Sequence, residues 1–225
     1  MKAKELKILR KRLVKAKRCD ELLQGFNNDT TFSFHTTGGV NDESEESSES
    51  DSAARRNNLS TIFARSSEMI DSQSKECLDL FEKNMGEMYR KSSWGLNMEE
   101  KSAELRDDKA RFLLLLDNNE KLAGFVHFRF EYDDEESPTC AVLYIFEIQI
   151  ESTYRRCGAG KKLMGIAERI AREQSMTKVL LTVFKSNHQA MAFYTKKLGY
   201  NIDESSPSKF GESADYEILS LEIIR

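Results

Sequence analysis

The sequence lacks several features that mark common classes of protein. Its 225 residues include only four cysteines, Cys19, Cys77, Cys140 and Cys157, and none of them forms a Cys-x-x-Cys pair. This spacing gives no support to a zinc site or a thioredoxin-like centre, so we expect reduced thiols and no bound metal. The N-terminus is basic but has no apolar core behind it, unlike a secretory signal. No apolar run is long enough to cross a bilayer. We therefore expect a soluble, intracellular protein with no membrane partner.

A strong excess of charge of one sign is also missing. The chain carries 34 Lys and Arg against 38 Asp and Glu, a formal net charge of −4, so the total does not suggest a nucleic-acid binder. The charge is unevenly distributed, however. Residues 1–18 are dominated by Lys and Arg, with Leu6, Leu9 and Leu13 near helical spacing. Two interpretations stay open: a solvated basic helix, or a segment for nuclear import or for binding chromatin or another polyanion.

An acidic, serine-rich stretch follows at residues 38–58, and it is almost free of apolar side chains. Such a stretch cannot bury enough surface to offset its ordering entropy, so we expect it to be disordered. We therefore divide the chain into a largely disordered extension, residues 1–58, and a compact domain, residues 59–225.

The compact part shows the patterns of an α/β (α+β) domain. One helical face is predicted before Ser92, with apolar residues at Cys77, Leu78, Phe81, Met85, Met88 and Tyr89. Strands are then predicted at 110–117, 121–132, 140–151, 178–185, 200–203 and 216–224. The first two form a hairpin, and a helix between the third and fourth makes those two parallel. Asn187 is a good N-cap for the next helix, so the prediction is a mixed central sheet flanked by helices.

Between the third strand and its helix lies the turn "YRRCGAGKKLM", residues 154–164. A P-loop would need glycine at Arg155 and Ser or Thr at Lys162, and a dinucleotide fingerprint would need glycine at Leu163. Both are excluded. A glycine-rich turn at a helix start, surrounded by cations, still suits a pyrophosphate. An ordinary tight turn with solvated basic residues is the alternative.

The order strand, Arg-x-x-Gly-x-Gly, helix, strand, then "NHQAMAFYTKKLGY" resembles the GNAT acetyltransferase superfamily. The resemblance implies the GNAT fold and acetyl-CoA as co-substrate. It further implies two parallel strands that splay apart around the pantetheine arm, with the pyrophosphate on the glycine turn. The implied cofactor-binding residues are Ile148, Gln149, Ile150, Arg155, Arg156, Cys157, Gly158, Ala159, Gly160, Lys161 and Asn187.

Further segments bring the resemblance closer to the N-alpha-acetyltransferase D family. They are "NMGEMYRKSSWGL", "FVHFRFEYDDE", "LYIFEIQIES", "LTVFKSNH" and "IDESSPS", and the resemblance runs from about residue 74 to the end. It implies acetylation of the N-terminal serine of core histone tails that begin Ser-Gly-Arg-Gly, in the nucleus and cytoplasm. The acidic stretch at 38–58 departs from the family pattern, which leaves its role open.

Glu147 interrupts an apolar strand, and a buried carboxylate is costly unless it is paired or functional. A structural ion pair is one explanation. The resemblance implies instead a general base, and burial would raise its reference pKa of ~4.3 for that task. An N-terminal α-amine, of reference pKa ~7.7–8.0, needs little help to attack the thioester directly. Tyr194 matches the general acid, with core packing as its alternative, and a backbone N–H near Ile148 or Ile150 would hold the carbonyl oxygen.

The remaining implied site residues bind the substrate. Glu131 and Asp133 would face the arginine at the third substrate position, and Phe146 stands where relatives are expected to carry tyrosine. His127 and His188 are interpreted as structural. Two other functions stay open: a GNAT enzyme acting on lysine side chains or small amines, and a non-catalytic CoA-binding module. The full predicted substrate set is Tyr89, Trp94, Glu131, Asp133, Tyr144, Phe146 and Tyr216.

Overall fold

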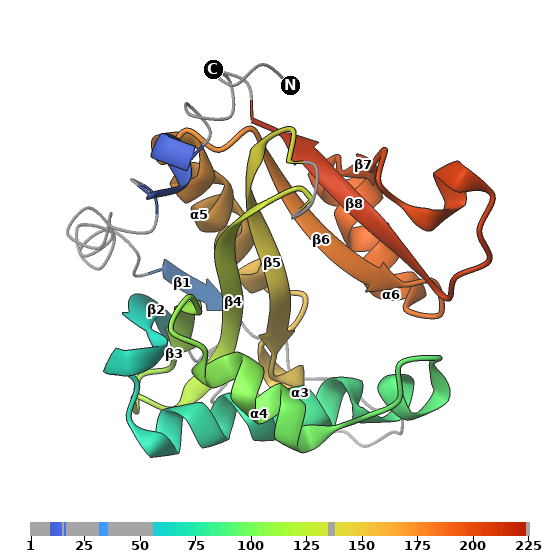
Figure 1. Ribbon diagram of the computed structural model, residues 1–225. Coiled ribbons are helices and arrows are strands. Elements are labelled where there is room, and N and C mark those ends of the chain that lie inside the picture. The colour runs from blue at the N-terminus through green and yellow to red at the C-terminus, as the bar shows by residue number, and fades with distance from the viewer. Residues whose placement is uncertain (1–9, 15, 17–31, 36–55, 135–137, 224–225) are drawn as a thin grey trace.

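A mixed β-sheet runs through the molecule, with helices packed on both of its faces (Figure 1). The computed structural model describes residues 10–14, 16, 32–35, 56–134 and 138–223. In these residues the strand order is β1-β2-β3-β4-β5-β6-β8-β7. The strands are β1 (Phe32–His35), β2 (Arg56–Arg65), β3 (Arg111–Leu116), β4 (Leu122–Tyr132), β5 (Ala141–Ile150), β6 (Lys178–Phe184), β7 (Asn201–Ile202) and β8 (Tyr216–Glu222).

The main helices cover both faces of the sheet. The first face is covered by α3 (Asp71–Lys91) and α4 (Met98–Arg106), and the second by α5 (Ala159–Glu173). A short α6 (His188–Ala192) continues into the π-helix η4 (Phe193–Leu198). The described residues also contain the 3₁₀ turns η2 (Ser66–Glu68), η3 (Ser152–Tyr154) and η5 (Pro207–Phe210). The predicted GNAT-type order of elements is confirmed.

Strand alternation divides the core between these two faces. On β4, Phe125 packs with the side chains of α3, whereas its neighbour Val126 packs with those of α5. Side chains of successive strand residues point to opposite faces, so β4 serves both cores. The face of α3 buries Cys77 and Phe81. Both faces of the central strands are therefore covered, which explains their near-continuous apolar sequence.

Two local departures from a regular ladder shape the centre of the sheet. Phe128 pairs with Ile145 but His127 pairs with Glu147, so Phe146 is an extra residue that bulges from β5. The parallel pairing of β5 with β6 runs from Val142↔Lys178 only as far as Ile145↔Leu181. Beyond the bulge, the two strands diverge and leave a wedge between them.

Parts of the sequence before residue 59 belong to the fold, while the division of the chain at residue 58 stays a prediction. Residues 10–14 are helical, β1 pairs with β2, and β2 begins at Arg56, before the expected domain start at residue 59. Leu13 and Ala16 are 6% and 1% exposed and belong to the same core as α5. The burial of these two side chains offsets the conformational entropy that is lost when this short stretch becomes ordered. The average composition of residues 1–58 does not reveal these buried positions. The acidic stretch at 38–55 lies outside the described residues, as does most of the basic segment.

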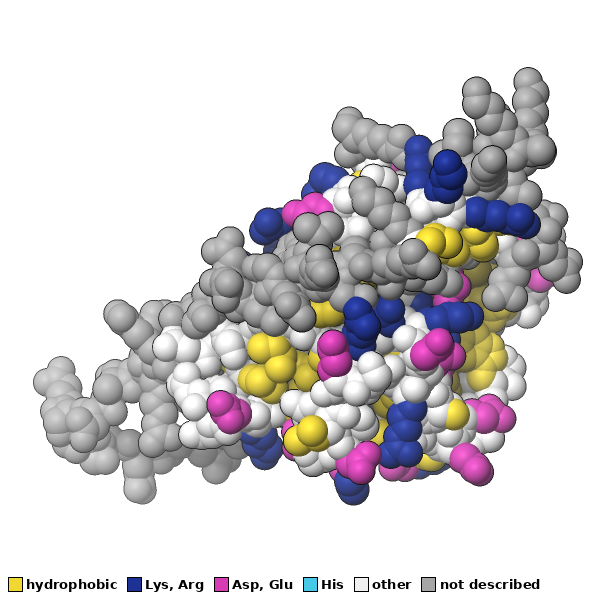
Figure 2. All heavy atoms as spheres, turned by 60° about the vertical axis from the view of Figure 1, so that its left-hand side comes forward, with side chains coloured by type: hydrophobic (Ala, Val, Ile, Leu, Met, Phe, Trp, Pro, Cys, Tyr) yellow, Lys and Arg dark blue, Asp and Glu magenta, His cyan; other side chains and the backbone are white. Residues whose placement is uncertain are grey.

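The surface turned forward in Figure 2 is chemically mixed. Lys and Arg side chains lie among Asp and Glu side chains over the described part of this face, with apolar atoms between them. This mixture agrees with the near-balanced composition. Among the residues that the structure describes, no helix is long and apolar enough to cross a membrane.

Replacing Leu13 by alanine should lower the free energy of unfolding by about 2 kcal/mol, because it empties a buried position in the core beside α5. The neighbouring Val14→Ala is the control, since Val14 is 51% exposed and should change stability by no more than about 0.5 kcal/mol. Chemical denaturation of both variants measures the difference. Equal stabilities would show that the N-terminal helix does not contribute to the core.

Candidate active site

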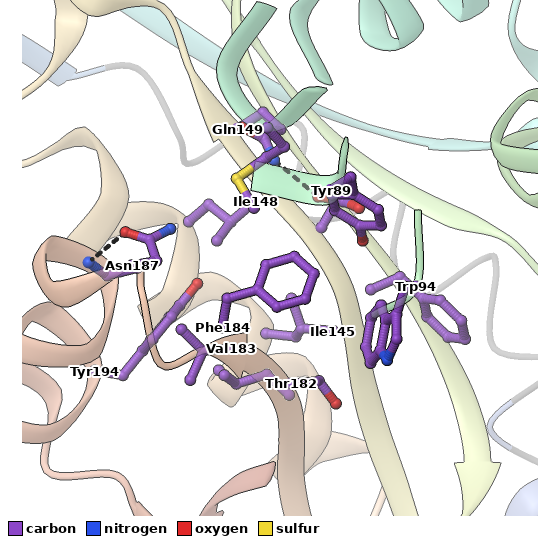
Figure 3. Close-up of a pocket in the computed structure, with 15 residues that line it drawn as sticks. Tyr89, Trp94, Ile145, Ile148, Gln149, Thr182, Val183, Phe184, Asn187 and Tyr194 are labelled. Carbon is purple, nitrogen blue, oxygen red and sulfur yellow. Dashed lines mark hydrogen bonds between the residues drawn. The ribbon is translucent and has the colours of Figure 1, made fainter. Parts of the chain in front are cut away.

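A pocket occupies the wedge between β5 and β6 (Figure 3). It is lined by Ile145 to Gln149 of β5, Leu181 to Phe184 of β6, Asn187 and Ala190 near α6, Tyr194 of η4, and Met85, Tyr89 and Trp94 from the end of α3 and its loop. β4 pairs with one edge of β5, while the other edge has no ladder partner beyond Ile145 within the part of the chain that the structure describes. Backbone groups on that free edge are available to a ligand that enters the wedge.

Glu147 lines this pocket and is 6% exposed. Its Oε1 accepts a hydrogen bond from Lys101 Nζ at 3.0 Å, and its Oε2 accepts one from Gln149 Nε2 at 2.8 Å. Burial raises the pKa of Glu147, while the nearby Lys101 charge and the hydrogen bond from Gln149 oppose that shift. The sequence posed a choice between a structural pair and a basic carboxylate, and the geometry combines the two.

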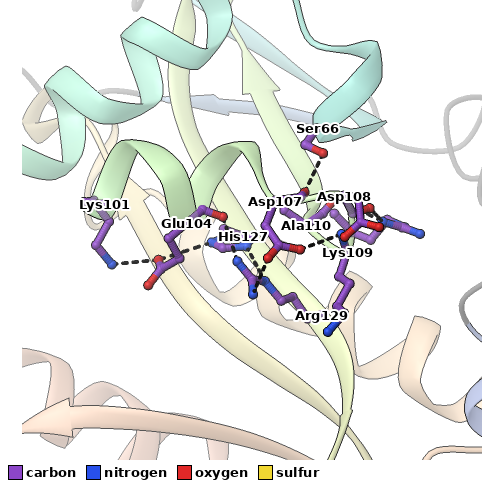
Figure 4. A network of polar contacts seen from close by, with 10 residues as sticks. Ser66, Lys101, Glu104, Asp107, Asp108, Lys109, Ala110, His127 and Arg129 are labelled. Carbon is purple, nitrogen blue, oxygen red and sulfur yellow. Dashed lines mark hydrogen bonds and ion pairs between the residues drawn. The ribbon is translucent and has the colours of Figure 1, made fainter. Parts of the chain in front are cut away.

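Lys101, the ion-pair partner of Glu147, belongs to a larger polar network on the side of Glu104 and Arg129 (Figure 4). Its ammonium also contacts Glu104 Oε1 at 2.8 Å. Arg129 donates to the Glu104 carbonyl at 2.7 Å and from Nε to His127 Nε2 at 3.4 Å. Burial, together with the Arg129 and Lys101 charges, lowers the pKa of His127 well below its usual range. The imidazole is therefore neutral and carries its proton on Nδ1.

The predicted structural role of His127 agrees with its packing. The ring is fully buried and stacks between Phe112 and Phe146, with centroids 5.1 and 4.9 Å away. Phe146 also contacts the Arg129 guanidinium, 4.5 Å from its ring centroid. The aromatic residue at this position is thus held by stacking, which needs no hydroxyl group.

Tyr194 reaches the pocket from the opposite side, with its hydroxyl pointing into the wedge (Figure 3). Its ring packs against Phe193 and Tyr200, with centroids 5.3 and 6.0 Å away. Burial raises its pKa, and the negative charge of Glu147 adds to that shift. The phenol consequently stays protonated and able to donate a hydrogen bond. Asn187 acts as the predicted N-cap and accepts from the Ala190 N–H at 3.1 Å.

The glycine turn lies where β5 leads into α5. Gly158 has φ +91° and caps the helix, and Arg156 is also left-handed at φ +61°. A Cβ placed on Gly158 would meet nothing within 4 Å, whereas one on Gly160 would lie 3.3 Å from Ile150 and Phe193. The first N–H that donates within α5 is that of Lys162, to Gly158 O at 3.0 Å. The preceding N–H groups have no acceptor inside the helix, which suits an anion.

Arg155 and Asn84 brace the end of β5 beside this turn. Arg155 donates to Ile150 O at 2.9 Å and to Asn84 Oδ1 at 2.6 Å. Asn84 in turn donates to Gln149 Oε1 at 3.0 Å. The chain of contacts from α3 through Asn84 and Gln149 ends on Glu147, so it fixes both the turn and the carboxylate. Cys157 contributes locally, with its thiol on Tyr154 O at 2.9 Å.

An aromatic cluster forms the mouth of the pocket. Trp94, which is 49% exposed, lies 5.1 Å from Phe184 and 5.0 Å from Tyr216, measured between ring centroids. Tyr89 contacts Trp94 at 6.0 Å and Phe184 at 5.0 Å.

The loop of Trp94 is tied to the loop before β8. Asp215 accepts from the Ser93 N–H at 2.7 Å and from the Ser93 hydroxyl at 3.1 Å. This Ser93–Asp215 bridge joins two segments that are 122 residues apart in sequence.

Several predicted site residues do not line this pocket. Tyr144 bonds Thr182 through its hydroxyl and contacts Phe146, and Glu131 lies farther along β4, opposite Val142. Asp133 accepts from the backbone N–H groups of Thr139 and Cys140, each at 2.9 Å, so its carboxylate orders its own loop. Their roles in substrate binding remain predictions.

Lys161 is exposed on the first turn of α5, and Ala159 is buried beneath it. The sequence-based prediction missed Lys101, Asn84 and Phe184. Lys101 and Asn84 belong to charged or polar stretches of helix, and such a sequence is typical of a solvent-exposed face. Phe184 follows the alternating pattern of β6, so the sequence could have indicated its position.

The sequence model of the acetyltransferase (GNAT) family matches residues 74–200, more than half of the chain. The chain belongs to the GNAT acetyltransferase family. Its activity is therefore acetyl transfer, with acetyl-CoA as the family's usual donor. The matched range includes the residues that line the wedge, the glycine turn and Glu147.

Solved structures share this GNAT fold. A GNAT acetyltransferase from Staphylococcus aureus Mu50 has a TM-score of 0.54 at 14% identity, covering 73% of this chain and 100% of that one. NAA60 of Arabidopsis thaliana, solved with a bisubstrate analogue, has a TM-score of 0.53 at 16% identity with the same coverage. The ribosomal-protein-S18-alanine N-acetyltransferase of Escherichia coli has 0.50 at 16%, covering 73% and 95%. At these identities the likeness concerns the fold.

The site is consistent with acetyl-CoA. The left-handed Gly158 with open space at its Cβ position and the free edge of β5 suit a pyrophosphate followed by an extended arm. Within the described ranges, no group of three or more His, Cys, Asp or Glu side chains is arranged to hold a metal ion.

We expect Gly158→Val to weaken CoA binding strongly, because a branched side chain would fill the open space at the turn and disfavour its φ of +91°. Calorimetric titration with CoA measures the effect. Gly211→Val is the matched control, since Gly211 also has a positive φ and no neighbour within 4 Å of its Cβ position. Unchanged CoA affinity in a folded Gly158 variant would remove the pyrophosphate from this turn.

Proposed function

We propose that this GNAT enzyme acetylates the α-amine of the N-terminal serine of histone tails that begin Ser-Gly-Arg-Gly. One observation supports this most directly: the segments that resemble the N-alpha-acetyltransferase D family converge on a single pocket. Tyr89 and Trp94, Glu147 and Phe184 come from three such segments and line the same wedge. Core packing alone would not require these distant segments to meet at an open, partly polar site.

The mouth of the pocket supports a chain end as the substrate. The Ser93–Asp215 bridge spans from the Trp94 loop to the start of β8. We propose that a chain end inserts beside this cluster, with a small first residue reaching past the aromatic side chains.

In the proposed reaction, acetyl-CoA supplies a thioester whose acetyl group passes to the amine. Glu147 accepts the proton that the attacking amine loses, because it is the buried carboxylate among the residues that line the wedge. A backbone N–H near Ile148 on the free edge of β5 donates to the carbonyl oxygen. Tyr194, which remains protonated, donates its proton toward the leaving sulfur. Direct attack in a ternary complex needs no covalent acetyl-enzyme.

Glu131 supplies the proposed contact with the substrate arginine, and Asp133 supports its loop. Histone tails are the proposed partners, with chromatin or another polyanion as a further partner of the basic N-terminal segment. The proposed locations are the nucleus and cytoplasm.

Glu147→Gln should lower kcat by roughly 10²- to 10⁴-fold, the usual contribution of a positioned base, with CoA affinity retained. Steady-state assays with acetyl-CoA and a peptide beginning Ser-Gly-Arg-Gly measure this. Glu173→Gln is the control, because Glu173 forms an exposed ion pair with Arg169 at the end of α5. A Glu147 variant within about threefold of the parent would mean that the proton leaves by another route.

Peptides that differ only at the third residue test the substrate. Replacing its arginine by alanine should cost about 1.5–3 kcal/mol in kcat/KM, the range for hydrogen bonds to charged groups. Glu131→Gln should remove most of that preference.

Mass spectrometry of free and N-terminally blocked peptides completes this assay. Acetylation of internal lysines in the blocked peptide at the rate of the free N-terminus would assign the enzyme to the lysine or small-amine class. CoA binding without transfer to any amine would indicate a non-catalytic module.

A further inference from the structure

Lys101 is a buried cation that the reaction scheme above leaves without a role. It lies on α4 and is only 9% exposed as a residue. Its Nζ is 3.0 Å from Glu147 Oε1 and 2.8 Å from Glu104 Oε1. The same ammonium lies over the rings of Phe81 and Tyr89, 4.7 and 5.6 Å from their centroids. The surroundings therefore fix its position on several sides.

Stability alone gives a poor account of this arrangement. Removing two charges from water costs several kcal/mol per ion, and a buried ion pair often contributes no more than apolar side chains of the same volume. Here one member of the pair is Glu147, the carboxylate among the residues that line the pocket. Lys101 links this carboxylate, whose side chain is 5% exposed, to Glu104, whose side chain is 28% exposed.

Other cations near Glu147 are already engaged. Arg129 contacts Asp107 at 3.3 Å and the Glu104 carbonyl, and His127 is neutral. Within the described part of the chain, the ammonium of Lys101 is the positive group in direct ion-pair contact with Glu147.

We propose that Lys101 is a positioning residue for acetyl transfer: its ammonium keeps the Glu147 carboxylate charged and fixed in the wedge, and Glu104 holds that ammonium in place. This rests on the proposed role of Glu147 as the base. Gln149 completes the arrangement by donating to the second carboxylate oxygen. Both oxygens of Glu147 are then oriented before the amine arrives, which is the preorganisation that general-base catalysis needs.

The two partners should shift the pH dependence in opposite directions. The groups that act on Glu147 are Lys101 and Glu104 from α4, Gln149 from β5, Tyr89 from α3 and Tyr194 from η4, and His127 of β4 is its cross-strand neighbour. Burial raises the pKa of Glu147, the Lys101 charge lowers it, and the Glu104 charge raises it. Because the base works as the carboxylate, the rate falls as the pH drops through this pKa. Loss of Lys101 moves that fall to higher pH, and loss of Glu104 moves it to lower pH.

The experiment compares pH profiles of kcat and kcat/KM for Lys101→Met, Glu104→Gln and the parent enzyme, with acetyl-CoA and the Ser-Gly-Arg-Gly peptide. For Lys101→Met we expect the acid limb of the profile, where the rate falls at low pH, to lie about 1–3 pH units higher. This is the usual effect on a carboxylate of losing an opposite charge in direct contact. For Glu104→Gln we expect a smaller shift downward. The peptide amine titrates identically in each assay, so differences report the protein.

Lys75→Met is the matched control, because it removes a lysine from an exposed ion pair with Asp79 on α3. It should leave the profile and CoA affinity unchanged. A parental acid limb in Lys101→Met, or shifts of both variants in the same direction, would overturn the proposal.

If Lys101→Met does not fold, the proposal is tested with Glu104→Gln and with Lys101→Arg, which keeps the positive charge. We then expect a near-parental acid limb for the arginine variant and a downward shift for Glu104→Gln. No shift in Glu104→Gln would reject the role of the bridge.

These variants distinguish a failure of the proposed base, Glu147, from a failure of the proposed role of Lys101. An active Glu147→Gln variant removes the base, and Lys101's role with it. An inactive Glu147→Gln beside a parental Lys101→Met rejects the Lys101 proposal alone. If another amine proves to be the substrate, the same series is run with that amine, and only the substrate assignment fails.

Discussion

The site depends on the place where β5 stops pairing with β6. Four residue pairs hold the two parallel strands together, up to Ile145 and Leu181, and the extra residue Phe146 then redirects β5. Because β4 still pairs with the other edge of β5, the strand stays rigid while its free edge faces a wedge. The same bulge brings Glu147 into register with His127. A single irregularity in the ladder therefore creates both the opening and the position of the carboxylate within it.

The sequence predicted much of the fold because its signals are local. The hairpin of β3 and β4, the helix after the glycine turn and the cap at Asn187 each depend on neighbouring residues, and all are present in the structure. The wedge itself was expected only through family resemblance, since no periodicity reveals where two strands part. A helix was among the interpretations of the N-terminal segment, but the burial of Leu13 was not expected because the overall composition of that segment is strongly basic.

The chemistry of the site was predictable only in part. Glu147 stood out as a charge within an apolar strand, but its partner did not, because Lys101 lies among the charges of "MEEKSAELR" on α4. Tertiary structure alone distinguishes this lysine from its solvated neighbours. The same holds for Asn84, which links α3 to Gln149 and Arg155 through hydrogen bonds. Residues that position others leave weaker traces in a sequence than residues that perform the chemistry.

The Ser93–Asp215 bridge also limits how the aromatic cluster can move. It joins the loop of Trp94 to the loop before β8, two segments that are 122 residues apart in sequence. Next to the bridge, the rings of Trp94 and Tyr216 are in contact. A shift of one loop alone would break two hydrogen bonds and this ring contact together. The two loops are therefore coupled, and a displacement at this side of the pocket involves both segments at once.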